Sequence, residues 1–505
     1  MGLISKMADK LRDGMRSFLR ITPAPVRTVV LDEGMDFLTN CVKNRIWYSG
    51  RATQLSSFYS QLADAVPTAM FWAAPMTRGL EIRKLHTGLP KIVVDMLTQI
   101  VVNDYNGVEI RSESTGALAE LWERIENKNG VEELLGRVIR DVAVVGDGAL
   151  KISYDKVISD LPIIEWFPAE RVRFVRRRGA VREIHFLTEY YHNSKSYIFT
   201  EIYGYGYISY ELSTPNGTPV SLSAVPQTEW ARGQSITFDS SVMFAVPVIF
   251  GEHPQYEGRG LSLIDSKDDA ADALDECVSQ WWDAIRAGRT REYFPEDLIP
   301  RNPETGVPMK PNAFDNRFIA IGNNMAEGGV NKIQTDTPEI HHESYLASYI
   351  TALDIYLQGL ISPSTIGIDT KKLDNAESQR EKEKTTLYTR QNLVALVSRF
   401  MPRLVKAALD FDSIVIHGGG ATGDFDVSAK FGEYANPSFE SQVETVSKAR
   451  TGGVMSVETA VDELYGDSRE SDWKEAEAAR IKEELGIAVL DEASGLDDII
   501  VQEFK

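Results

Sequence analysis

The chain has only two cysteines, Cys41 and Cys277, among its 505 residues. So few thiols exclude a disulfide framework and a zinc site built from cysteine pairs, and they are typical of a reducing compartment. The chain also lacks an apolar run of the roughly 18 residues that a membrane-spanning helix needs. The nearest run, 242–250, is interrupted by Pro247. The sequence therefore predicts a soluble protein without disulfides.

Motifs that mark common catalytic sites are absent as well. The sequence contains no phosphate-binding Gly-x-x-x-x-Gly-Lys-Ser/Thr loop, no His-Glu-x-x-His motif and no Gly-x-Ser-x-Gly elbow. The glycine pairs in 204–206 and 258–260 lack the remaining positions of a glycine-rich nucleotide-binding motif, so they do not predict nucleotide binding. His86, beside an apolar helix, is expected to be a hydrogen-bonded structural residue. We therefore expect no enzyme activity, no cofactor and no bound metal.

Positive charge is in deficit. The chain has 54 lysines and arginines against 74 aspartates and glutamates, which gives a net charge of −20. An acidic chain does not hold nucleic acid tightly over its whole surface, because phosphate binding depends mainly on lysine and arginine. Such a chain could still let DNA pass with little adhesion.

The N-terminal segment departs from this acidic character. Residues 1–21 place apolar side chains on one helical face with lysines and arginines around them. A basic amphipathic helix can lie on a membrane, dock on a partner or pack on its own domain. We favour docking or packing, because nothing else in the chain suggests lipid. Lys6 stands where a myristoylation signal needs serine or threonine.

The pattern of apolar residues predicts an α+β protein. The chain reads as helical from Phe37, and an amphipathic helix is predicted over 131–145, ending at Gly146. From 148 to 250, short β-branched and aromatic runs alternate with glycine, proline and asparagine, which is typical of strands and turns. We interpret this second part as a β-rich insert in a helical frame.

A long helix is predicted over 261–287, with an acidic row beside its apolar face. The row consists of Asp265, Asp268, Asp269, Asp272, Asp275 and Glu276. One interpretation is a solvated face. Another is a site for Mg²⁺ or Ca²⁺, which we disfavour because a regular helix cannot wrap a cation as a loop does.

A second helix is predicted over 340–362, where apolar residues recur at three- and four-residue steps. Between the two helices, 288–339 is rich in proline, glycine and asparagine and has one clear strand, 317–321. Pro363 stops the second helix. A polar loop follows, and then a long helix in which Pro402 should produce a kink.

The C-terminal part is predicted to begin with a β-hairpin formed by 413–416 and 425–431. Three helices should follow, and Ser456 should cap the second of them. The tail from 487 to 505 is acidic and less regular.

One stretch carries a family resemblance. The run 359–369, Gly-Leu-Ile-Ser-Pro-Ser-Thr-Ile-Gly-Ile-Asp, is followed by Glu-Ser-Gln-Arg-Glu-Lys-Glu at 377–383. Together they resemble the corresponding segment of portal proteins, the head-to-tail connectors of tailed bacteriophages, of the siphovirus type. The Trp-Tyr-x-Gly grouping at 47–50 is similar to the start of the wing in these proteins. The order of the predicted elements extends the resemblance over most of the chain.

The resemblance implies the phage portal fold and a division of the chain. This fold has a mainly helical wing with a β-rich insert, a two-helix stem, a small α/β clip and a helical crown. The implied parts are an N-terminal arm (1–36), a wing (37–260, helical to about 147 and β-rich from about 148 to 250), a stem helix (261–287), a clip (288–339), a second stem helix (340–362), a tunnel loop (363–376), the wing's long helix and hairpin (377–435), a crown (436–486) and a tail (487–505).

The resemblance also implies a function and partners. Portal proteins form a homo-oligomeric ring, by family a dodecamer, at one capsid vertex of the virion, through which double-stranded DNA is packaged and ejected. The terminase large subunit and head-completion proteins dock on the clip, and major capsid and scaffolding proteins surround the ring during assembly in the host cytoplasm. On this basis the acidic row would line the channel and repel phosphate. The tunnel loop would face DNA with Ser364, Thr365, Lys371, Lys372 and Asn375, and the docking residues would be Arg291, Tyr293, Phe294, Phe314, Arg317 and Phe318.

Three questions stay open at this stage. The only dense basic cluster could contact nucleic acid, although we favour a charged strand edge or an ion-pair surface against an acidic neighbouring copy. It comprises Arg171, Arg173, Arg176, Arg177, Arg178 and Arg182. The chain could instead be a capsid or connector protein without a DNA channel, or a metal-dependent hydrolase that uses the acids of 265–276.

Overall fold

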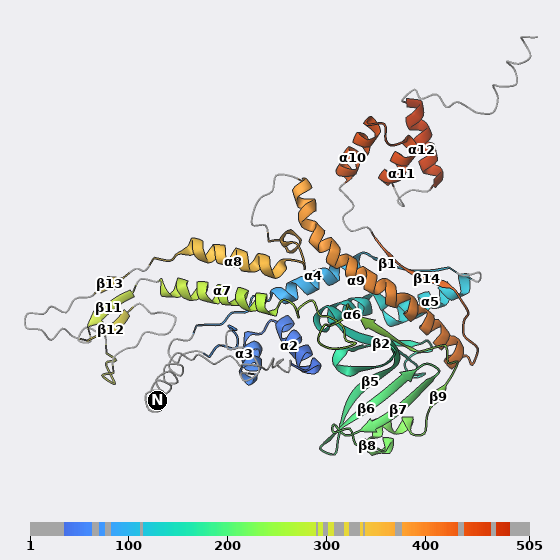
Figure 1. Ribbon diagram of the computed structural model, residues 1–505, viewed down its shortest axis with the longest axis horizontal. Coiled ribbons are helices and arrows are strands. Elements are labelled where there is room, and N and C mark those ends of the chain that lie inside the picture. Colours follow the sequence, from blue (N-terminus) through green and yellow to red (C-terminus); the bar gives the residue numbers. More distant parts are fainter. Residues whose placement is uncertain are drawn as a thin grey trace, which may run out of the picture. The chain divides into compact units, whose positions relative to one another are not determined.

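The structure is a computed structural model, and it describes most of the chain (Figure 1). The described residues are 35–62, 70–75, 82–111, 115–288, 291–295, 301–307, 318–322, 334–336, 339–368, 376–432, 439–465 and 471–484. The chain divides into two compact units, one formed by 1–99 with 110–428 and the other by 100–109 with 429–505. Helices and sheets are mixed, so the α+β class is confirmed.

The first helices agree with the sequence pattern. They are α2 (Phe37–Ser49), α3 (Ala52–Gln61), α4 (Leu89–Asn103), α5 (Thr115–Asn129) and α6 (Val131–Val145). Asp36 caps α2 by accepting a hydrogen bond from the Thr39 amide at 2.6 Å. The predicted helix 131–145 is confirmed as α6, which buries its apolar face.

The predicted β-rich insert is confirmed as two antiparallel sheets. One has the order β10-β2-β3 and consists of β2 (Asp147–Ser153), β3 (Ile163–Pro168) and β10 (Ala245–Ile249). The other has the order β4-β5-β6-β7-β8, with β9 also paired to β7, and consists of β4 (Val172–Arg177), β5 (Ala180–His192), β6 (Lys195–Gly204), β7 (Tyr207–Ser213), β8 (Pro219–Val220) and β9 (Ile236–Thr237). Three short 3₁₀ segments accompany them, η1 (Ala169–Arg171), η2 (Leu222–Ala224) and η3 (Pro226–Ala231).

Buried Lys151 joins the two sheets. Its Nζ lies 2.7 Å from Glu201 of β6 and 3.0 Å from Glu165 of β3, and it sits over the Phe167 ring. A buried ammonium group needs such partners, because its desolvation would otherwise cost several kcal/mol.

The long helices differ from the prediction at some ends. They are α7 (Asp268–Ala287), α8 (His342–Leu357) and α9 (Ala376–Phe411), with the 3₁₀ turn η5 (Pro363–Ile366) before α9 and Pro402 inside it. The predicted start at 261 is wrong because polar side chains bind nearby backbone amides instead. Ser262 accepts from the Ile264 amide, and Asp265 accepts from the Ser262 amide.

The predicted hairpin of 413–416 with 425–431 is also wrong. Residues Asp412–Ile416 continue α9 as a π-helical turn, η6, although their β-branched side chains favour a strand. Residues Asp426–Phe431 do form a strand, β14, but its partner is β1 (Tyr105–Arg111). Tertiary contacts therefore override the local preference.

The second unit contains the three predicted C-terminal helices. They are α10 (Phe439–Thr451), α11 (Val457–Tyr465) and α12 (Ser471–Glu484). The predicted cap is confirmed, because Ser456 Oγ accepts from the Thr459 amide at 3.2 Å. Val457, Val461 and Ala478 form a small core. Within the described ranges, no helix combines the length and apolar character that a bilayer crossing needs.

Two glycines allow two backbone segments to pass in close contact: Gly146, where α6 meets β2, and Gly260. A Cβ on Gly260 would lie 2.0 Å from the Gly146 carbonyl oxygen, and Gly146 itself has a φ of +93°. Beside this contact, buried Asp147 accepts two hydrogen bonds from Arg259 and one from the Gly260 amide. Burial raises the pKa of Asp147 to about 6, and the Arg259 guanidinium opposes that shift.

We predict that Gly260→Ala lowers the free energy of unfolding by about 3 kcal/mol, because backbone atoms must move to admit the methyl group. The matched control is Gly116→Ala in α5, where a Cβ meets nothing within 4 Å. The control should be neutral or stabilised by about 0.5 kcal/mol. Urea unfolding followed by circular dichroism measures the free energy of unfolding of both variants. Equal urea midpoints would contradict the close backbone contact between Gly260 and Gly146.

Candidate functional site: the α7–α8 helix pair

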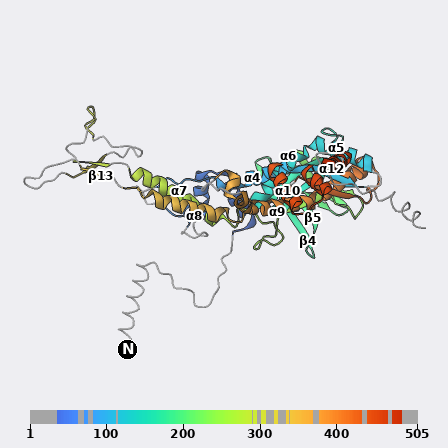
Figure 2. The same ribbon diagram turned by 90° about the horizontal axis from the view of Figure 1, so that it is seen from above.

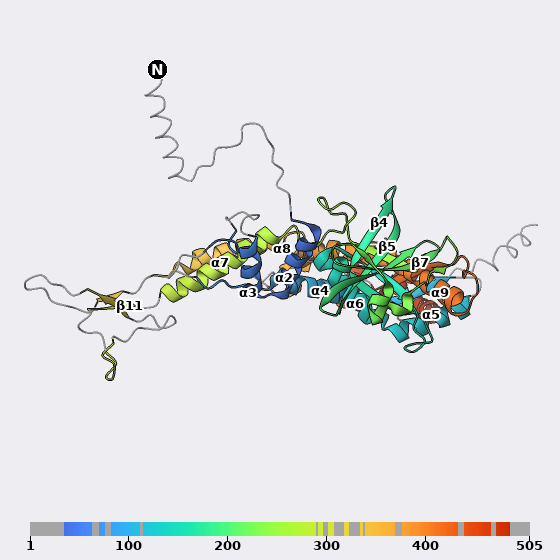
Figure 3. The same ribbon diagram turned by 90° about the horizontal axis from the view of Figure 1, so that it is seen from below.

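Helices α7 and α8 form an antiparallel pair, and they lie side by side in all three views (Figures 1, 2 and 3). At one end, Lys267 donates to the carbonyls of Ile355 and Gln358 at 3.1 and 2.7 Å, which joins the start of α7 to the end of α8. Further along, the rings of Trp281 and Tyr349 lie 6.3 Å apart. The predicted two-helix hairpin is therefore present.

The excursion between the helices contains more strand than expected. Strand β11 (Arg291–Pro295) lies between β12 (Phe318–Ile321) and β13 (Gln334–Asp336), whereas only the strand at 317–321 was predicted. The predicted docking residues Arg291, Tyr293 and Phe294 share β11, and Phe318 begins the neighbouring strand. The predicted docking residues Phe314 and Arg317 lie outside the described residues.

Asp275 of the acidic row is fully buried and accepts four hydrogen bonds. The donors are the Trp72 indole at 3.1 Å, the Thr87 amide and hydroxyl at 2.8 and 2.9 Å, and His86 Nδ1 at 2.6 Å. His86 Nε2 lies 3.2 Å from the Trp47 carbonyl. The prediction that His86 is a hydrogen-bonded structural residue is confirmed.

Asp272, one turn earlier in α7, is also buried. It accepts from the backbone amides of Phe71 and Trp72 at 2.7 and 3.0 Å. Burial raises the pKa of Asp272, and these two amides partly offset the rise. Lys84 stacks over the rings of Phe71 and Trp72 and donates to their carbonyls. The loop at 71–72 is thus fixed to α7.

The two acids nearest the start of α7 bind α2. Asp265 accepts from the side-chain amides of Asn40 and Asn44 at 2.8 and 2.7 Å. Asp268 forms an ion pair with Lys43 at 2.7 Å. These contacts join segments more than 200 residues apart in the sequence.

The acidic row is therefore not a continuous charged wall, and this part of the prediction is wrong. Two members, Asp269 and Glu276, remain available for contacts outside the chain: Asp269 is exposed, and half-buried Glu276 accepts from Gln280. The sequence does not indicate which segment packs against a helix, so buried acids look the same as solvated ones. Among the described residues, no group of three or more His, Cys, Asp or Glu could hold a metal ion.

The residues of α2 that bind Asp265 and Asp268 were not predicted from the sequence, although a signal exists. Asn40, Lys43, Asn44 and Trp47 recur at the three- and four-residue steps of one helical face, and all four are buried. A polar stripe that includes a tryptophan indicates packing against a polar partner rather than against water.

The start of the predicted tunnel loop is held close to α9. The Ser362 amide donates to Thr386 Oγ1 at 2.9 Å, and Thr365 Oγ1 lies 2.9 Å from the same oxygen. Ser364 Oγ donates to Ser362 Oγ at 3.3 Å. Lys371, Lys372 and Asn375, which were also predicted to face DNA, lie outside the described residues.

The arginine cluster lies on and beside β4, the edge strand of the larger sheet, and all six side chains are exposed. Arg176 donates to the Gly258 carbonyl at 2.8 Å, and Arg173 lies 3.2 Å from His185 Nδ1. Charged side chains on an edge strand oppose pairing with other strands. The interpretation as a charged strand edge agrees with this placement.

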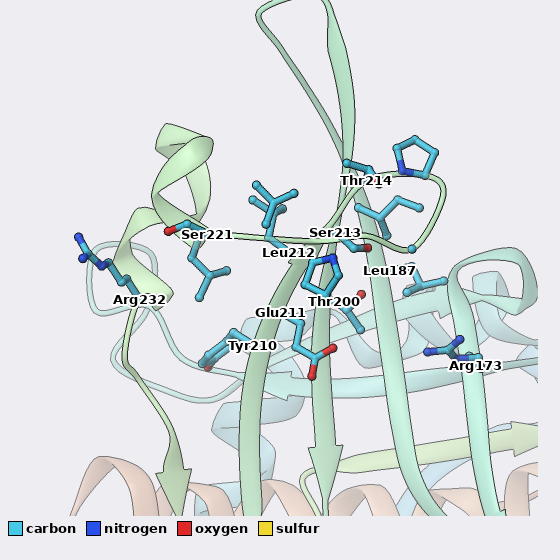
Figure 4. Close-up of a pocket in the computed structure, with 16 residues that line it drawn as sticks. Arg173, Leu187, Thr200, Tyr210, Glu211, Leu212, Ser213, Thr214, Ser221 and Arg232 are labelled. Carbon is cyan, nitrogen blue, oxygen red and sulfur yellow. The ribbon is translucent and has the colours of Figure 1, made fainter.

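A hollow of about 760 Å³ lies apart from the helix pair, on the larger sheet around β7 and β8 (Figure 4). Arg173, Tyr210, Glu211 and Arg232 are among the side chains that surround it. No histidine, lysine or cysteine occurs among the described residues of its lining.

Comparison with known proteins gives weak likenesses. No family model matches the chain, and no curated protein matches it. A chain of the "virion of native gene transfer agent (GTA) particle" is 14% identical with a TM-score of 0.37, over 87% of this chain and 93% of that chain. A chain from the "neck of native GTA particle computed with C12 symmetry" is 14% identical with a TM-score of 0.35, over 85% and 99%. Likeness at such low TM-scores does not establish a common fold.

We predict that Asp275→Ala lowers the free energy of unfolding by about 3 kcal/mol or more, because it leaves several buried donors without an acceptor. The matched control is Asp354→Ala, an exposed aspartate of α8, which should change it by less than about 0.5 kcal/mol. Thermal unfolding of both variants tests this. Equal melting temperatures would show that Asp275 does not hold the segments around it.

Proposed function

We propose that the chain is the portal protein of a tailed-bacteriophage-type particle, a ring-forming conduit for double-stranded DNA at one capsid vertex. The observation that carries the proposal is the antiparallel α7–α8 pair with a small sheet in the excursion between its helices, followed by η5 and the 36-residue helix α9. This order matches the stem, clip, stem, tunnel loop and wing helix that the sequence resemblance implies. The proposal is therefore supported by the sequence resemblance at 359–383 and by the order of the described helices and strands.

The proposed mechanism is electrostatic and geometric rather than enzymatic. Each copy has a net charge of −20, so a ring of copies repels the phosphates of a duplex and lets it slide with little adhesion. This effect rests on the charge of the whole ring and does not need a row of six acids on α7. The loop lysines Lys371 and Lys372 would hold DNA weakly.

Energy for packaging would come from a partner, the terminase large subunit, because the sequence contains no phosphate-binding loop. The sheet β11–β13 would be the docking surface for this motor during filling and for head-completion proteins afterwards. Major capsid and scaffolding proteins would surround the ring. The alternative of a metal-dependent hydrolase is weakened, since Asp265, Asp268, Asp272 and Asp275 already bind protein donors.

We expect the purified chain to form a ring of about a dozen copies with a central hole, because the resemblance is to a family of cyclic oligomers. Light scattering gives the mass, and negative-stain images of the same fraction show the hole. A closed oligomer without a hole would favour a connector that has no DNA channel. A monomer at all concentrations would contradict the proposal.

We also expect Lys371→Ala with Lys372→Ala to reduce DNA retention in a packaging reaction by several-fold, since each lysine removed deletes a phosphate contact. Ring formation should not change. The matched control is Lys128→Ala with Lys156→Ala, which removes two exposed lysines elsewhere in the chain. Equal packaging by both double variants would contradict a role of the loop lysines.

A further inference from the structure

The far half of the helix pair exposes large apolar side chains on one side. Trp282 and Ile285 of α7 are 56% and 39% exposed, and Leu346 of α8 is 44% exposed. Trp281 and Tyr349 pack between the helices at this level, so the three exposed residues lie around one contact of the pair. We call Trp282, Ile285 and Leu346 the apolar patch. Isolated apolar residues on a surface are common, whereas large apolar side chains grouped on one face are typical of interaction sites.

A groove of about 390 Å³ runs along the other side of the pair, closer to the start of α7. It is lined by Ala270, Ala273, Ala347, Ser348, Thr351, Ala352 and Ile355, and Ile355 is 52% exposed. Trp282 is nine residues from Ala273, and Ile355 is nine residues from Leu346. At 3.6 residues per turn, nine residues are two and a half turns. The apolar patch and the groove therefore face opposite directions on both helices.

Charges of opposite sign accompany the two faces. Asp269 and Glu276 lie four and three residues from Ala273, so both flank the groove. Arg286 lies four residues after Trp282 and flanks the apolar patch. If the patch of one helix pair met the groove of another, Arg286 would approach the two carboxylates.

We propose that the apolar patch of one copy packs into the groove of the next copy, with Arg286 facing Asp269 and Glu276 across the contact. This inference rests on the proposed ring and names the surfaces that build it. Because the two faces are different and point in opposite directions, the contact is heterologous, and repeating it around an axis closes a ring. Asp269 and Glu276 then belong to the contact between copies and not to the channel wall.

The apolar and charged features both favour a second copy as the occupant. A two-fold contact of patch against patch would bring Arg286 close to its own symmetry mate and would leave the groove empty. A membrane surface would be repelled by the two carboxylates beside the groove. Packing the patch into the groove would cover the apolar residues of both and would bring Arg286 near Asp269 and Glu276.

Disulfide trapping tests the contact directly. In a Cys277→Ser background, Ile285→Cys marks the patch and Ser348→Cys marks the groove, while Trp282 is kept. A chain that carries both cysteines should, on oxidation, give a ladder of covalent species beyond the dimer on a non-reducing gel. Each chain that carries only one of the two introduced cysteines should stay monomeric on the gel, because the remaining native thiol, Cys41, is buried. A mixture of the two chains should stop at the dimer.

Three results would overturn the inference. Cross-linking of Ile285→Cys with itself would show a two-fold contact. A ring seen by light scattering but without the ladder would leave the proposed function standing and show that other surfaces build the ring. A chain that stays monomeric in solution would remove both proposals together.

Assembly should also depend on the tryptophan. Trp282→Ala should raise the concentration at which half of the chains assemble at least tenfold, and Trp282→Phe should restore most of the loss. The matched control is Tyr388→Ala, an aromatic residue of α9 that is 71% exposed and lies on neither face. Equal assembly of the two alanine variants would contradict the proposed contact.

Discussion

A buried carboxylate must have hydrogen-bond donors, and Asp275 obtains them from residues far away in the sequence. Trp72, His86 and Thr87 supply four donors to it, and on the other side of the imidazole ring His86 Nε2 lies 3.2 Å from the Trp47 carbonyl oxygen. Leaving such a charge unpaired would cost several kcal/mol, so the loop at 71–75 and the segment 82–88 are required to stay against α7. The position of the whole helix pair on the helical part of the first unit follows from this requirement.

The helix α7 consequently has two halves with different chemistry. In the first half, carboxylates face protein donors, and the helix is fixed to α2 and to the segments around His86. In the second half, aromatic and aliphatic side chains face α8 on one side and water on another. The polar contacts of the first half and the exposed apolar side chains of the second half can thus be changed by mutation independently of each other.

Much of the fold could be predicted from local patterns, and much of the site could not. The helix 131–145, the strands of the insert and the cap at Ser456 depend on nearby residues, so periodicity and capping rules suffice. The burial of Asp272 and Asp275 depends on residues about 200 positions away, and no local pattern contains that information. The same limit explains why 412–416, rich in isoleucine and valine, continues a helix.

The anchored first half of α7 has a mechanical consequence. Two antiparallel helices in contact are stiff. A load applied at the β11–β13 end would therefore turn the helix pair as a lever whose pivot lies at Asp272 and Asp275. The load would act on the hydrogen bonds that Asp272 and Asp275 accept. A force applied at the β11–β13 end would therefore first displace Trp72 and His86, whose rings lie 6.4 Å apart beside the pivot.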